Sequence, residues 1–524
     1  MQGNRIANTG LANRIMDADA AASLITNGMT IGMSGFTGSG YPNWHRYRRL
    51  YERYADRLVP GRPGALVSQN GRLTRSQSLA LARDLRQLER MLKIATLVAA
   101  LSLSVSPALA APEADAARLR ADVEKLVSFG TRHTLSSPDH PTRGIGAARR
   151  WAATEFAKIG KACGGCITVE QIDRRFTGPR APNGVNVVNV LGVQAGTGNP
   201  DDVIIISAHI DSRVSDVADF TSDAPGANDD GSGVALVLEA ARTLSKERFA
   251  PTIIYAVLSG EEQGLWGGRL IAETARARGW QVRALLNNDI VGNTEGQDGR
   301  RVTDRVRVFS EGIRASESLA EAMARRGSGA EDDGPSRAVM RAAQRVGKAR
   351  SDLGLEVFGV RRPDRFSRGG DHLPALELGY PAIRFTVGVE NYDHQHQDLR
   401  EENGRKFGDT IDEMDFPYLA RVTALNIAVI RELASAPPAP ASAVLGGALS
   451  SDTQVSWPEV PGAARYKVYW RRADARDWEQ SQETTDTKLT LPGVIVDDHF
   501  AGVAAIAENG AESAVTFAGL PPRQ

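Results

Sequence analysis

Val203-Ile-Ile-Ile-Ser-Ala-His209-Ile-Asp211 is a short apolar run that ends in a histidine, with a carboxylate two residues further on. The run is too short for a typical helix and is rich in β-branched residues, which indicates a buried strand. A histidine at a strand end can bind a metal ion through one ring nitrogen while a carboxylate holds the other. On its own, such a histidine is more often structural. Its interpretation as a metal ligand therefore depends on the segments around it.

Two more apolar runs end in acidic residues. Val257-Leu-Ser-Gly precedes Glu261 and Glu262, and Leu285-Leu-Asn-Asn precedes Asp289. Adjacent acids after an apolar strand are costly unless they are paired or bound to a cation. Parallel strands bring their carboxyl ends to one edge of a sheet, so these side chains are expected to lie close together.

Two loop segments carry further candidate ligands. Pro225-Gly-Ala-Asn-Asp229-Asp230-Gly-Ser-Gly233 places an acid in a tight turn before a helix, where a helix-capping Asx turn is an equally good interpretation. Asn391-Tyr-Asp-His394-Gln-His396-Gln-Asp398 offers two histidines. Imidazole nitrogens and carboxylate oxygens are ligands that zinc accepts. A shared carboxylate can hold two ions about 3.5–4 Å apart, an arrangement used for hydrolysis.

The rest of this region alternates between strand-like and helical patterns. Short apolar runs alternating with helices predict an α/β fold, with a mostly parallel mixed sheet flanked by helices. A helical pattern is expected from 112 to about 150. The expected strands are 185–193, 203–208, 252–258, 282–289 and 382–386, and the expected helices between them are 234–244 and 265–278.

A different pattern follows residues 435–442, a Pro/Ala-rich linker. Short β runs are expected at 453–457, 466–471, 488–491 and 500–505. Together with Trp457, Tyr466 and Trp470, residues 443–524 resemble a fibronectin type III module, which implies one small β-sandwich.

Composition excludes some functions. The chain has 524 residues, which favours several domains, and 63 basic against 63 acidic residues give a formal net charge of zero. We therefore expect no nucleic-acid partner. Cys163 and Cys166 are the two cysteines of the chain, so a multi-cysteine zinc site is excluded. A small loop disulfide is favoured, and a redox motif of the same spacing stays open.

Residues 111–434 resemble the co-catalytic zinc aminopeptidases that include the secreted bacterial leucine aminopeptidases. The resemblance rests on five motifs in order: His-x-Asp, Gly-Ala-Asn-Asp-Asp-Gly-Ser-Gly, Gly-Glu-Glu, Asn-Asp-Ile-Val-Gly and a final His-x-x-x-Asp. It implies an exopeptidase with two Zn²⁺ per chain that acts on peptides with a free N-terminus. Carboxypeptidase-type and glutaminyl-cyclase-type specificities occur on the same scaffold and stay open, as does a peptide- or surface-binding protein with a degenerate catalytic domain.

The resemblance also implies a role for each site residue. One zinc would be bound by His209 and Asp289, and the other by Glu262 and His394, with Asp229 bridging both ions. Asp211 would orient His209, and Glu261 would be the general base. His394 is preferred over His396 because only His394 has the four-residue spacing to Asp398. Three other residues are expected to support structure or the pocket rather than bind metal, namely His133, Asp371 and His372.

The N-terminal region has its own patterns. Residues 91–110 combine positive charge, a short apolar core at 94–105 and Ala108-Leu-Ala110, which is typical of a signal peptide and too short to span a membrane comfortably. A buried core helix is the alternative.

Residues 1–90 are then expected to be a fusion or a misplaced start, with Met91 as the true start. A real, poorly ordered extension is the alternative. Residues 5–42 resemble the edge of an acetyl-CoA hydrolase/transferase, but no later segment matches. We expect an exported protein with no stable membrane span after cleavage.

Overall fold

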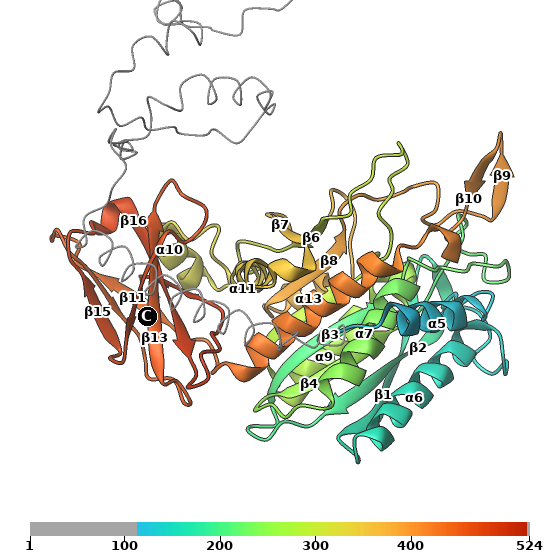
Figure 1. Cartoon of the computed structure of the whole chain (residues 1–524), viewed down its shortest axis with the longest axis horizontal. Coiled ribbons are helices and arrows are strands. Elements are labelled where there is room, and N and C mark those ends of the chain that lie inside the picture. The colour runs from blue at the N-terminus through green and yellow to red at the C-terminus, as the bar shows by residue number, and fades with distance from the viewer. Residues whose placement is uncertain (1–112, 521–524) are drawn as a thin grey trace, which may run out of the picture. The chain divides into compact units, whose positions relative to one another are not determined.

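The structure is a computed structural model that describes residues 113–520 (Figure 1). The predictions for residues 1–90, for the resemblance at 5–42 and for the signal peptide at 91–110 lie outside the described residues. Within 113–520, no helix is both long enough and apolar enough to cross a membrane.

An eight-stranded mixed sheet forms the centre of the larger domain, in the order β1-β2-β4-β3-β5-β8-β6-β7. Strands β4, β3, β5 and β8 run parallel to one another, β6 and β7 are also parallel, and the remaining neighbours are antiparallel. The predicted α/β class with a mostly parallel mixed sheet is confirmed. The strands are β1 Ile167–Gly178, β2 Ala181–Gln194, β3 Asp202–His209, β4 Thr252–Leu258, β5 Gln281–Asn288, β6 Arg305–Phe309, β7 Glu356–Val360 and β8 Ala382–Val387.

Helices cover both faces of this sheet, which explains why its central strands are apolar throughout. Ile204 and Ile206 of β3 belong to one core, whereas Val203 and Ile205 belong to the other, because successive side chains of a strand point to opposite faces. One face is covered by α5 Ala116–Val127, α6 Gly144–Ala162, α7 Gly231–Leu244, α11 Pro335–Ala349 and α13 Phe416–Ser435, and the other by α9 Trp266–Arg278 and α12 Leu373–Glu377.

The helical region predicted for 112–150 is interrupted in the structure. Helix α5 ends at Val127, and α6 begins only at Gly144. Gly130 adopts a φ of +72° between them, a left-handed conformation that ends a helix, and Pro138 follows in the same loop. The expected strands and helices of the core are present, while β1, β6 and β7 lack the continuous apolar runs that identified the central strands.

The C-terminal region is a seven-stranded β module around a core of its own. Its strand order is β14-β13-β16-β17-β11-β12-β15, and the four predicted β runs coincide with β12, β13, β15 and β16. The strands are β11 Ala443–Gly446, β12 Thr453–Ser456, β13 Arg465–Arg472, β14 Gln480–Thr484, β15 Lys488–Leu491, β16 His499–Ile506 and β17 Thr516–Gly519.

Cys163 and Cys166 form a disulfide bond directly after α6. The bond agrees with the favoured interpretation of this pair as a small loop disulfide.

Candidate active site

The ends of three neighbouring strands carry most of the predicted site. His209 is the last residue of β3, Glu261 and Glu262 follow β4, and Asp289 directly follows β5. These strands are parallel and adjacent, so their carboxyl ends meet at one edge of the sheet. Gly260 makes the sharp turn before Glu261 with a φ of +78°, a conformation that favours glycine.

Asp229 lies between two histidines. Its Oδ1 is 3.1 Å from Nε2 of His209, and its Oδ2 is 3.0 Å from Nε2 of His396. The turn is fixed by Asp409, whose carboxylate accepts the backbone N–H of Asn228 at 2.8 Å and that of Asp229 at 2.6 Å. Each oxygen of Asp229 therefore faces a different half of the site. Nothing in the local sequence around Asp409 marks it for this role.

The histidine that reaches the site is His396, and the preference for His394 was wrong. Nε2 of His396 lies 3.1 Å from Oε1 of Glu262, whereas Nε2 of His394 lies 3.6 Å from Oε2 of Glu413, away from the site. The loop path, rather than the spacing to Asp398, decides which histidine points inward: Asp398 turns to Ser215 and accepts its hydroxyl at 2.7 Å.

Asp211 holds His209 through a different atom from the one expected. Nδ1 of His209 is 3.0 Å from the backbone carbonyl oxygen of Asp211, but 3.7 Å from its carboxylate. The carboxylate instead accepts backbone N–H groups of the turn after β4, from Gly260 at 2.9 Å and Glu262 at 3.1 Å, and the hydroxyl of Thr134 at 2.9 Å. Asp211 thus positions both the histidine and the adjacent acids.

Two arginines that the sequence analysis did not identify contact the candidate ligands. Arg384 of β8 is fully buried and its Nη2 lies 2.8 Å from Oδ1 of Asp289. Arg213 donates from Nε to Oε2 of Glu262 at 2.8 Å, and its Nη2 lies 2.6 Å from Nδ1 of His396. Each acid therefore has one oxygen held by a guanidinium and the other turned toward the site.

Burial dominates the electrostatics of the acids. It raises the pKa of Glu261 well above its usual range, and the carboxylates of Glu262 and Asp289 add to this effect. Burial likewise raises the pKa of Asp289 to about 7. For Asp229, burial is outweighed by its contacts with His209 and His396, which hold its pKa well below the usual range. So many buried acids at one point are stable as anions only beside cations.

The residues fit metal ions. His209, Glu261 and Asp289 form one group whose ligand atoms all lie within 4.8 Å of one another, and Asp229, Glu262 and His396 form a second. Oε1 of Glu262 is buried without a hydrogen-bond partner, although Nε2 of His396 is 3.1 Å away. An imidazole nitrogen and a carboxylate oxygen this close to each other can bind the same ion. Imidazole and carboxylate donors are suited to zinc.

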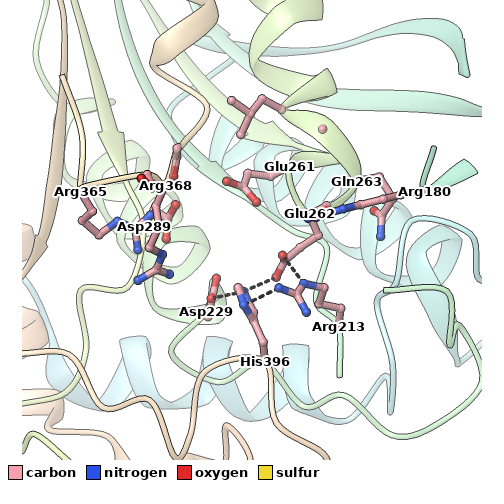
Figure 2. Close-up of a pocket in the computed structure, with 14 residues that line it drawn as sticks. Arg180, Arg213, Asp229, Glu261, Glu262, Gln263, Asp289, Arg365, Arg368 and His396 are labelled. Atoms are coloured by element: carbon pink, nitrogen blue, oxygen red, sulfur yellow. Dashed lines mark hydrogen bonds and ion pairs between the residues drawn. The ribbon is translucent and has the colours of Figure 1, made fainter. Parts of the chain in front are cut away.

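A pocket of about 520 Å³ opens over these residues (Figure 2). In Figure 2, Asp289, Arg365 and Arg368 lie on one side, and Glu262, Gln263 and Arg180 lie on the other. The 14 lining residues include four acids, four arginines and His396, and Leu265 is the one large apolar side chain among them. Charged side chains therefore surround the point where the candidate ligands converge.

The three supporting residues lie outside the lining of this pocket. Asp371 accepts the backbone N–H of Gly268 at 2.8 Å, near the start of α9. Nε2 of His372 lies 2.7 Å from the carbonyl oxygen of Pro363, and burial lowers the pKa of this histidine. His133 is buried, with Nε2 3.1 Å from the carbonyl oxygen of Val217. All three side chains therefore form hydrogen bonds with backbone atoms.

Comparison with known proteins identifies the family of the chain. Residues 189–414 match Peptidase family M28. A probable zinc metalloprotease of the fungus Leptosphaeria maculans is 41% identical over 410 residues, which span 77% of this chain and 95% of the relative. The chain belongs to peptidase family M28. It is therefore a zinc metallopeptidase, and the N/O ligand set described above is consistent with that metal.

Other relatives and solved structures extend the comparison of this M28 peptidase. A probable zinc metalloprotease of Pyricularia oryzae is 40% identical over 420 residues, covering 77% of this chain and 82% of the relative. LapA aminopeptidase of Legionella pneumophila is 17% identical, with a TM-score of 0.44 over 62% of this chain and 73% of that one. A glutaminyl cyclase of Porphyromonas gingivalis is 18% identical, with a TM-score of 0.42 over 62% of this chain and 99% of that one.

Proposed function

We propose that this M28 chain is an exported aminopeptidase that removes N-terminal residues from peptides with the help of two zinc ions. The observation that carries the proposal is the position of Asp229, whose two oxygens face His209 and His396 at 3.1 and 3.0 Å. A carboxylate placed in this way can be shared by two ions. His209 and Asp289 would complete one ion's ligands, and Glu262 and His396 the other's.

When bound, the ions would polarise the scissile carbonyl and acidify the attacking water. Glu261 supplies the proton transfer. It lines the pocket, and burial raises its pKa, which suits a group that must accept a proton and then release it. As the water oxygen bonds to the carbonyl carbon, Glu261 takes its proton. Glu261 then gives that proton to the departing amine nitrogen as the C–N bond breaks.

The size of the pocket favours an exopeptidase. A volume of about 520 Å³ is that of a site for a small ligand, with room for the terminal part of a peptide. A glutaminyl-cyclase-type reaction is the second candidate within the fold. Because cyclases of this scaffold work with a single zinc, the two separate ligand groups support the peptidase.

Export is proposed on two independent features. Residues 91–110 have the charge, length and small-residue ending of a signal peptide. The Cys163–Cys166 disulfide belongs to proteins of oxidising compartments. We also propose that residues 443–524 are a fibronectin type III-like module, supported by the edge-on contact of Trp457 with Tyr466 in its core.

The test uses the full chain, with bound metal quantified and aminoacyl-nitroanilides assayed before and after chelation. We expect about two zinc per chain, activity that chelation abolishes, and a loss of about 10²–10⁴-fold in kcat for Glu261→Gln with its zinc retained. Glu377→Gln, at an exposed position, is the matched control and should keep full activity. One zinc without peptidase activity would favour the cyclase reaction, and a chain that binds no zinc would exclude the proposal.

A further inference from the structure

The wall of the pocket beside Asp289 carries an excess of positive charge. Glu390 is buried and contacts three guanidinium groups: Arg307 and Arg368 at 2.6 Å each, and Arg365 at 3.3 Å. Although burial opposes it, these arginines hold the pKa of Glu390 below its usual range, so Glu390 is ionised. One negative charge faces three positive charges at this point.

Neighbouring acids do not remove the excess. Arg365 also donates to Asp364 at 3.0 Å, but Asp364 is shared with Arg384, whose other contact is Asp289. Arg365 is nearly fully enclosed, and its remaining nitrogen donates to the carbonyl oxygen of Gly369 at 2.8 Å. Although Arg365 lines the pocket, each of its guanidinium nitrogens already has a partner, so it contributes charge there rather than a free donor.

Within this group, Arg368 faces the pocket and keeps N–H groups that its protein contacts do not use. Its two terminal nitrogens contact Glu390 and, at 3.2 Å, the side-chain oxygen of Gln395. These contacts use two of its five N–H groups, and its side chain is 30% exposed. Figure 2 shows Arg368 beside Asp289, on the side of the ligand set opposite Arg180.

With two zinc ions bound, the pocket as a whole would also carry an excess of positive charge. The four lining acids match the charge of two zinc ions, which leaves the four lining arginines, only partly offset by Glu390 and Asp364 behind them. Leu265 is the one large apolar side chain of the lining, which otherwise carries mainly charged and small groups. A guanidinium with free donors at such a site matches a carboxylate in charge and geometry.

The geometry points to a substrate that carries a carboxylate next to the scissile bond, bound by Arg368. The carboxylate is either the side chain of an N-terminal Asp or Glu or the free α-carboxylate of a very short peptide. This inference rests on the proposed peptidase function and narrows its substrate class.

The experiment compares matched substrates on the zinc-loaded full chain. Glu- and Asp-nitroanilides against Leu- and Lys-nitroanilides test the side-chain source, and Leu-Leu against its C-terminal amide tests the α-carboxylate source. We expect one of the two anionic sets to have the higher kcat/KM. Arg368→Gln should lower the anionic-to-neutral ratio of kcat/KM by about 10–100-fold, the size of a lost charge-assisted hydrogen bond.

Arg362→Gln is the matched control. It lies on the same loop, is exposed, does not line the pocket and makes the same change of charge, so the ratio should stay as in the parent chain. Neutral substrates that are cleaved as well as anionic ones, or an Arg368→Gln chain with an unchanged ratio, would overturn the inference while leaving the peptidase function intact.

A binding measurement separates the two proposals. Calorimetry with glutarate, compared with its neutral diamide, should show binding that weakens at least about tenfold in Arg368→Gln but not in Arg362→Gln. If no substrate is cleaved but glutarate binding depends on Arg368, the peptidase proposal fails and the carboxylate subsite stands. Absence of glutarate binding to the parent chain, or equal binding by Arg368→Gln and Arg362→Gln, contradicts the subsite.

Discussion

The carboxylate of Asp211 holds the backbone of Glu262, with Oδ2 3.1 Å from its N–H, although the two residues are 51 positions apart. The same carboxylate accepts the N–H of Gly260 at 2.9 Å, and the backbone carbonyl of Asp211 lies 3.0 Å from Nδ1 of His209. One residue therefore sets the relative position of a strand-end histidine and the acids after the neighbouring strand.

Asp211→Asn should disturb the turn that carries Glu261 and Glu262, while the backbone contact with His209 stays in place. The amide offers one acceptor in place of two and turns a donor toward the N–H groups of the turn after β4. We expect a loss of about 10–100-fold in metal affinity or in kcat/KM, as for other residues that orient metal ligands. Zinc titration and kinetics measure it. Asp216→Asn, on the exposed part of the following loop, is the control and should match the parent. Equal zinc affinity and activity in both variants would contradict this role.

The two histidines of the 391–398 loop allow a paired test. His396 approaches Asp229 and Glu262, whereas His394 approaches Glu413. His396→Ala should lose one of two bound metals after dialysis, and at least about 10²-fold in kcat. His394→Ala should keep both metals and most of the activity. Metal analysis of both variants is the measurement. Loss of metal in His394→Ala but not in His396→Ala would support the choice of His394 made from its spacing to Asp398.

Buried charges also join the peptidase domain to the β module. Asp333, which precedes α11, lies 2.9 Å from Arg471 of β13 and also contacts Arg341, and all three side chains are buried. Asp333→Ala would leave buried Arg471 without its anion and Arg341 with only its longer contact to Asp332 at 3.3 Å. We expect the free energy of unfolding to fall by about 3–5 kcal/mol, measured by denaturant unfolding. Asp474→Ala removes an exposed partner of Arg472 and should have little effect. Similar curves for both variants would show that Asp333 is not needed at this contact.

The sequence predicts those parts of the site that follow from local order along the chain. His209, Glu262 and Asp289 could be found because apolar strands end at or just before them, and parallel neighbours bring such ends together. The choice between His394 and His396 could not be made in this way, since it depends on the path of a loop without regular structure. Arg384 and Asp409 also escaped notice, because their partners lie 95 and 180 positions away.

Glu311 provides a test of pH dependence outside the site. It follows β6, and partial burial raises its pKa from 4.5 to about 7. The folded chain therefore binds this proton more tightly than the unfolded chain, so the stabilising contribution is complete below about pH 4.5 and is lost as pH rises through about 7. Glu311→Gln removes the titration. We expect its melting temperature, relative to the parent, to be higher by about 1–3 °C at pH 8 than at pH 5, measured by calorimetry. Glu401→Gln, on exposed β9 (Arg400–Glu402), should show the same offset at both pH values. A constant offset for Glu311→Gln as well would mean that burial does not perturb this carboxyl.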